Sequence, residues 1–168
     1  MKTIAIDPSG NFEEGKGHTG IAMITDNDWE NVEVFSISAK NFNSRFEYWT
    51  KIIAEMIHLS ARDANVVIES YVTRMNGFTI GKQAETAMLI GALIWHLDSI
   101  GVPYTFQAPS AAKTRFKDEL LPKYYPKLQL DTSTGKNRYL YDGRLISDHI
   151  RDAMKHLLYF KRYKEYKK

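Results

Sequence analysis

The stretch Asn65-Val66-Val67-Ile68-Glu69-Ser70 decides the fold of this 168-residue chain. Three consecutive β-branched residues predict a buried strand, and the run ends on a carboxylate. The stretch lies between two longer segments with helical periodicity, about residues 44–61 and 79–99. A buried strand flanked by helices is typical of a parallel crossover in an α/β sheet.

Outward from this strand, the sequence predicts four more. Residues 2–7, 20–25 and 31–38 alternate apolar and polar residues, and a turn at Asp26-Asn27 separates the last two. A glycine-rich connection, residues 8–18, joins the first two runs. On the C-terminal side we expect a strand at 103–107 and a helix from Ser110 to about residue 120. A polar stretch with Pro122, Pro126 and Gly135 follows, and a final helix opens after Ser147 and reaches about residue 163.

This order of elements predicts an α/β fold with one mixed, five-stranded sheet. Short connections make the first three strands an antiparallel meander, whereas helical crossovers place the fourth and fifth strands parallel to the first. Helices should flank the sheet. The length favours a single domain over residues 1–168, ending in a basic tail at about 161–168.

The composition excludes several classes of protein. Apolar residues make up 43% and charged residues 26%, as in ordinary globular proteins, and the absence of cysteine excludes disulfides and thiolate chemistry. No secretion signal is visible, and no apolar run approaches the roughly 18–20 residues of a membrane span. We therefore expect a cytoplasmic protein with no membrane partner.

The net charge is only +3, but the cations are clustered. One cluster is the tail, which interleaves lysines and Arg162 with tyrosines, and another runs from Lys113 to Arg138. Such clusters suit a phosphate backbone, although a solvated helix face or a frayed terminus would also explain them.

Two carboxylates end strands that should be neighbours in the sheet. Asp7 closes the first strand and Glu69 the fourth. Because adjacent carboxylates repel each other, a hard divalent cation between them would resolve the conflict. The alternative is that Asp7 caps a turn and Glu69 is an exposed strand end.

The start of the last helix offers further ligands. His149 and Asp152, or Asp148 and Asp152, are spaced to lie near each other on a helix. However, the apolar stripe that includes Ile150 points away from Asp152, so a helical wheel places Asp148 and Asp152 toward solvent.

Four motifs in order resemble the RuvC family of Holliday junction resolvases, and most of all its compact, phage-type members. They are Ile6-Asp7-Pro8-Ser9, Thr19-Gly20, Val67-Ile68-Glu69 and His149-Ile150-Arg151-Asp152-Ala153. The resemblance implies a ribonuclease H-like fold and a metal-dependent, homodimeric endonuclease that nicks four-way and other branched DNA symmetrically. The connection from Ser9 to His18 is longer than the family's usual turn.

The resemblance also implies roles for residues. Asp7, Glu69, His149 and Asp152 match the metal ligands, which would hold two Mg²⁺ or Mn²⁺ ions, with Asp7 between them. Lys113 matches a lysine near the scissile phosphate. The DNA-binding residues would be Tyr71, Arg74, Phe78, Lys82, Lys113, Arg115 and Lys117, with Tyr71 or Phe78 as the aromatic that stacks on a base.

Other interpretations stay open. The same metal site could serve a ribonuclease H-like nuclease acting on structured RNA, RNA–DNA hybrid or flapped DNA. A non-catalytic junction-binding module is a second alternative, but such a module would be expected to lose a carboxylate. Ala84, Ala87 and Gly91 form a small-residue stripe on the helix at 79–99. The simpler interpretation is that this stripe packs on the helix's own sheet; the other is that it meets a second copy.

Overall fold

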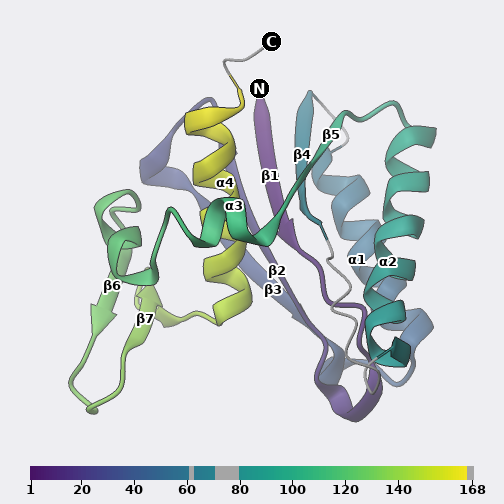
Figure 1. The fold of residues 1–168 in the computed structure, drawn as a ribbon, viewed down its shortest axis with the longest axis horizontal. Helices are drawn as coiled ribbons and strands as arrows, with labels where there is room; N and C mark the ends of the chain where they lie inside the picture. Colours follow the sequence, from purple (N-terminus) through teal and green to yellow (C-terminus); the bar gives the residue numbers. More distant parts are fainter. Residues whose placement is uncertain (61–62, 71–79, 166–168) are drawn as a thin grey trace.

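The computed structural model describes residues 1–60, 63–70 and 80–165, without the side chains of Glu14 and residues 80–83. Its main feature is a five-stranded sheet in the order β3-β2-β1-β4-β5 (Figure 1). The strands are β1 (Lys2–Asp7), β2 (His18–Thr25), β3 (Glu33–Ser38), β4 (Ala64–Glu69) and β5 (Tyr104–Gln107). β2 is antiparallel to β1 and β3, whereas β4 is parallel to β1 and β5. The predicted sheet is therefore confirmed.

Helices cover both faces of this sheet (Figure 1). α1 (Arg45–Ser60) and α2 (Ile80–Ser99) pack on one face, where they bury Ile4, Ile6 and Ile68. α4 (Asp148–Tyr163) packs on the other face against Ala5 and Val67. No helix in the described ranges is both long and apolar enough to cross a membrane.

The alternation of side chains along a strand assigns the two carboxylates to a face. Asp7 follows Ala5 by two residues, and Glu69 follows Val67 by two, so each carboxylate points to the same face as that apolar residue. Ile6 pairs with Ile68, so the next residues of these parallel strands lie side by side. Asp7 and Glu69 therefore share the face that α4 covers.

A second, smaller sheet lies beside α4, where the sequence predicted only a polar stretch. It consists of β6 (Leu128–Asp131), β7 (Arg138–Tyr141) and β8 (Arg144–Leu145), all antiparallel. Asp142 and Gly143, which join β7 to β8, both have positive φ (49° and 75°), as a tight hairpin requires. Tyr141 packs into the core beneath α4 and donates from its hydroxyl to the Val32 carbonyl at 2.6 Å.

The helix predicted from Ser110 to about residue 120 is wrong. The chain forms α3 (Pro109–Lys113) and then a separate 3-10 helix, η4 (Asp118–Lys123). Lys117 is extended (ψ 152°), and this break lets Phe116 and Leu121 both reach the core. Pro122, which lacks an N–H, lies inside η4.

The first strands differ from prediction only at their starts. His18 belongs to β2 instead of the connection before it. β3 begins at Glu33 because residues Trp29–Asn31 form a 3-10 turn, η2, whose backbone N–H at Glu30 donates to the Asp28 side chain. The turn at Asp26-Asn27 is confirmed, with φ of 50° and 61°.

The connection between β1 and β2 is fixed onto α1 and α2. It contains the 3-10 turn η1 (Glu13–Gly15), and a similar turn, η3 (Ala39–Asn41), follows β3. The Tyr48 hydroxyl donates to the Ser9 carbonyl at 2.8 Å, and the Trp49 indole donates to the Gly10 carbonyl at 2.9 Å. The backbone N–H of Gly10 donates to Thr86 at 3.0 Å. Side chains of α1 and α2 thus hold the longer connection, which leaves the end of β1 in a defined place.

Candidate metal centre

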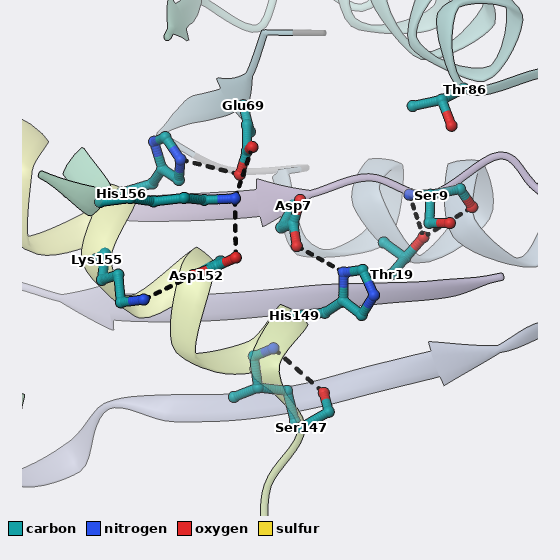
Figure 2. Close-up of polar contacts among 12 residues, drawn as sticks. Asp7, Ser9, Thr19, Glu69, Thr86, Ser147, His149, Asp152, Lys155 and His156 are labelled. Atoms are coloured by element: carbon teal, nitrogen blue, oxygen red, sulfur yellow. Dashed lines mark hydrogen bonds and ion pairs between the residues drawn. The ribbon is translucent and has the colours of Figure 1, made fainter. Parts of the chain in front are cut away.

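Three carboxylates from three elements meet at the edge of the main sheet. Asp7 ends β1, Glu69 ends β4 and Asp152 lies in the second turn of α4. One oxygen of each lies within 4.8 Å of the others. In Figure 2 the three side chains point toward one another between the sheet and α4. The wheel-based placement of Asp152 toward solvent is therefore wrong, whereas Asp148 is exposed as the wheel indicates.

The start of α4 reaches this edge because β2 has no side chain there. Ser147 caps the helix by accepting from the Ile150 N–H at 3.3 Å. Gly20, which pairs with Asp7 across β1 and β2, lies directly under the first turn of the helix. A Cβ at Gly20 would lie 2.2 Å from the His149 carbonyl oxygen. Only glycine permits this approach, and the approach brings His149 to Asp7.

His149 and Asp7 are hydrogen-bonded partners. His149 Nδ1 lies 2.7 Å from Asp7 Oδ2, and this bond raises the pKa of the imidazole. Burial raises the pKa of the Asp7 carboxyl to about 6; the bond with His149 opposes the rise and the charge of Glu69 adds to it. His18 stacks on the far side of His149, with ring centroids 5.7 Å apart. Asp7 therefore resists ionisation mainly because it is buried.

Glu69 is held at both of its oxygens. Lys113 Nζ donates to Oε1 at 2.9 Å, and His156 Nε2 lies 3.0 Å from Oε2. Burial raises the pKa of this carboxyl, but His156 and Lys113 outweigh it and lower the pKa to about 2. Glu69 and Asp7 thus have pKa values moved in opposite directions within one cluster.

Lys113 places its ammonium among the carboxylates. Its Nζ lies 2.9 Å from Glu69 Oε1 and 2.8 Å from Asp152 Oδ2. A cation bridging two oxygens is the arrangement that a divalent ion would adopt, and the all-oxygen set with one nearby imidazole suits Mg²⁺ or Mn²⁺. The residues present therefore fit a hard divalent metal, with the Lys113 ammonium as a stand-in ion.

Asp152 is supported by a second lysine. Lys155 Nζ lies 2.8 Å from Asp152 Oδ1 and 2.5 Å from Asp118 Oδ1. Although burial lowers the pKa of Lys155, its bonds to Asp118 and Asp152 raise it overall. Asp118 also accepts from Arg151 Nε at 2.9 Å. The start of η4 is thus tied to the ligand-bearing turn of α4.

The DNA-binding residues predicted from the sequence are only partly described. Arg115 and Lys117 are exposed between α3 and η4, and the Arg115 guanidinium lies 5.0 Å from the centre of the Tyr163 ring. Lys82 belongs to α2, but its side chain is outside the described atoms. Tyr71, Arg74 and Phe78 lie outside the described residues.

Sequence reasoning missed the residues that support the carboxylates. They are Gln107, Asp118, Lys155 and His156. Spacing along α4 gave two local signals: His156 follows His149 by two helical turns and so lies on the same face, and Lys155 follows Asp152 by three residues. The contacts of Gln107 and Asp118 depend on tertiary packing and have no local signature.

The fold belongs to the ribonuclease H-like α/β class, a mixed five-stranded sheet flanked by helices. Among solved structures, the chain is similar to RuvC from Thermus thermophilus in complex with a Holliday junction substrate. The TM-score is 0.60 at 17% identity over 96% of this chain and 92% of that chain. A second structure of Thermus thermophilus RuvC gives a TM-score of 0.60 at 15% identity over 96% of both chains. No family model and no curated protein sequence matches. The predicted RuvC-like fold is confirmed.

Proposed function

We propose that this protein is a divalent metal-dependent endonuclease that resolves Holliday junctions and other branched DNA by symmetric nicking. One observation supports the proposal most: Asp7, Glu69 and Asp152 converge within 4.8 Å on a fold shared with RuvC. The solved relative is described in complex with a Holliday junction substrate, which favours branched DNA as the substrate class.

The metal ligands would be Asp7, Glu69, His149 and Asp152. Two bound Mg²⁺ or Mn²⁺ ions would activate a water and stabilise the leaving 3′ oxygen of a phosphodiester. Before it can be a ligand, Asp7 must give up the proton that burial favours. His149 Nδ1, 2.7 Å away, is positioned to orient this carboxylate.

Lys113 would act on the phosphate. With Glu69 and Asp152 holding a metal, the Lys113 ammonium would be freed from its two ion pairs. Its side chain is 33% exposed, so it can turn toward a phosphate at the mouth of the site. There it would offset the negative charge that accumulates as the bond breaks. Arg115 and Lys117, both exposed just beyond α3, would bind adjacent phosphates without reading sequence.

The proposed enzyme would be a homodimer through α2. The small-residue stripe of Ala84, Ala87 and Gly91 is exposed, so the simpler interpretation that it packs on its own sheet is wrong. Met88 and Trp95 extend it as an exposed apolar stripe. Met88 and Trp95 are 61% and 67% exposed, and a Cβ at Gly91 would contact nothing within 4 Å. An apolar stripe with small residues at its centre suits a second copy of the same helix. Two copies would supply the two active sites that symmetric nicking needs.

The test is nicking of a labelled four-way junction beside a linear duplex and an RNA–DNA hybrid, in Mg²⁺ or Mn²⁺. We expect paired nicks on the junction with the wild type and none with Asp7→Asn. Preferential cutting of the hybrid would move the assignment to a ribonuclease. Binding of the junction without cutting in either metal would favour a non-catalytic module.

A further inference from the structure

His156 is a buried histidine without a role in the site as proposed so far. It lies in the middle of α4 with 0% of its surface exposed. Buried polar side chains are costly unless they are paired, so its partners indicate what it does. Both of its ring nitrogens face polar side chains: Nε2 faces Glu69 Oε2 at 3.0 Å, and Nδ1 faces Gln107 Oε1 at 2.9 Å.

The two oxygens of Glu69 face different groups. Oε1 accepts from Lys113, whose ammonium also pairs with Asp152, whereas Oε2 lies 3.0 Å from His156 Nε2. Oε2 is buried, and no described residue gives it a well-aligned hydrogen bond. Lys113 holds Oε1, and His156, whose Nε2 is buried as well, is the group that faces Oε2.

The contact needs a proton on Nε2, because an unprotonated nitrogen 3.0 Å from a carboxylate oxygen would repel it. Gln107 can provide for this in either amide orientation. With Oε1 at Nδ1, the imidazole holds a proton on both nitrogens; with the amide turned, Gln107 donates to Nδ1 and only Nε2 is protonated. Gln107 is itself 3% exposed and ends β5 beside Glu69. The three side chains form a chain of contacts within the core.

We propose that His156 is a positioning residue for the metal centre: by binding Oε2 of Glu69, it presents Oε1 to the ions. This rests on the proposed function. Groups that fix the orientation of ligating carboxylates typically change metal affinity or activity by about 10- to 100-fold when removed. His156 and Asp152 lie on one face of α4. The same helix therefore provides one proposed ligand, Asp152, and the side chain that positions another, Glu69.

The test compares His156→Phe with His156→Gln. Phenylalanine keeps a flat ring in the cavity but has no donor, whereas glutamine can place an amide N–H near the position of Nε2. Circular dichroism establishes that each variant is folded, and titration calorimetry with Mn²⁺ alone measures affinity. We expect about 10- to 100-fold weaker Mn²⁺ binding for His156→Phe and recovery of most of the affinity in His156→Gln. On the four-way junction, kcat should fall while KM stays unchanged.

Two results separate this inference from the proposed function. Mn²⁺ binding that Asp7→Asn abolishes but folded His156→Phe leaves intact would overturn the positioning role alone. A wild type that binds no Mn²⁺ would overturn both.

A second measurement needs no variant at His156. Nitrogen-15 spectra of the wild-type imidazoles should show a protonated Nε2 on His156 that shifts when Mg²⁺ is added. An unprotonated Nε2, or one that does not respond to Mg²⁺, would contradict the proposal even if the variants failed to fold.

Discussion

Asp7 is the residue of the cluster whose ionisation is most disfavoured by burial and by a neighbouring carboxylate. Its carboxyl is largely buried and lies beside Glu69, and its pKa is raised to about 6. Glu69 avoids the same cost because His156 and Lys113 contact its two oxygens. The site thus contains one carboxyl that is already ionised and one that ionises near neutral pH.

The raised pKa of Asp7 predicts how metal and pH act together. In the metal-free protein, the folded-state pKa lies above the ordinary value of 3.8, so this carboxyl stabilises the fold below about pH 4. That contribution, about 3 kcal/mol, is lost as the pH rises through about 6. A metal binds the ionised form, so Mg²⁺ affinity should be about tenfold weaker at pH 5 than at pH 7.

The measurement is thermal unfolding with and without Mg²⁺ at these two pH values. The increase in Tm on adding Mg²⁺ should be clearly larger at the higher pH. Asp7→Asn serves as the control, and it should show almost no Mg²⁺ effect at either pH. An equal increase at both pH values in the wild type would refute the role given to Asp7.

At the scale of elements, the fit of β2 under α4 is the contact that assembles the site. Gly20→Ala places a methyl group 2.2 Å from a backbone oxygen of α4, so the helix must move. We expect the free energy of unfolding to fall by about 1–3 kcal/mol, as for overpacked cores, and junction cutting to be lost. Urea unfolding and the nicking assay measure the two effects.

Gly91→Ala is the matched control for stability, measured at a concentration at which the protein is monomeric because Gly91 lies in the proposed dimer interface. Gly91 is exposed on α2 and has open space around it, so alanine should leave stability unchanged or raise it by up to about 1 kcal/mol. Equal destabilisation by the two substitutions would show that the loss of stability does not come from the close approach of α4 to Gly20.

The elements also show what the sequence could predict. β1 and β4 follow local patterns of apolar residues, so their extents could be predicted closely. The small sheet was missed because its strands are only two to four residues long, although Asp142-Gly143 is a strong hairpin signal. The helix at 110–120 was wrong because the demand to bury both Phe116 and Leu121 overrides helix propensity.

The same reasoning applies to the site. Asp7 and Glu69 could be predicted because strand parity and sheet order are visible in the sequence. The helical wheel failed for Asp152 because α4 packs against α3 as well as against the main sheet, and Lys113 of α3 pairs with Asp152. His156 could not be predicted as a support, since its partners Glu69 and Gln107 are distant in the sequence; for Lys155, only its spacing from Asp152 was visible.

At the scale of the whole molecule, the exposed stripe on α2 predicts a dimer. Trp95→Ser together with Met88→Ser removes its two large apolar side chains, which are 67% and 61% exposed. We expect the sedimentation coefficient to change from that of a dimer to that of a monomer at the same concentration. Paired cutting of the junction should become single nicking, because each copy then acts alone.

Phe46→Ser is a suitable control for that experiment. Phe46 is 77% exposed on α1, outside the stripe, and its removal should leave the oligomeric state unchanged. A double variant that sediments like the wild type would exclude α2 as the interface.

The pairing of Asp7 with His149 has a consequence for the protein during its synthesis. These two residues are 142 positions apart, and at bacterial or eukaryotic rates of translation this interval takes on the order of ten seconds. Throughout that time the emerging chain contains Asp7 and then Glu69, but neither the imidazole nor Asp152. A ribosome-bound or prematurely terminated product therefore has no complete set of ligands. The proposed DNA-cutting centre can therefore form only after the last helix has been made and has docked.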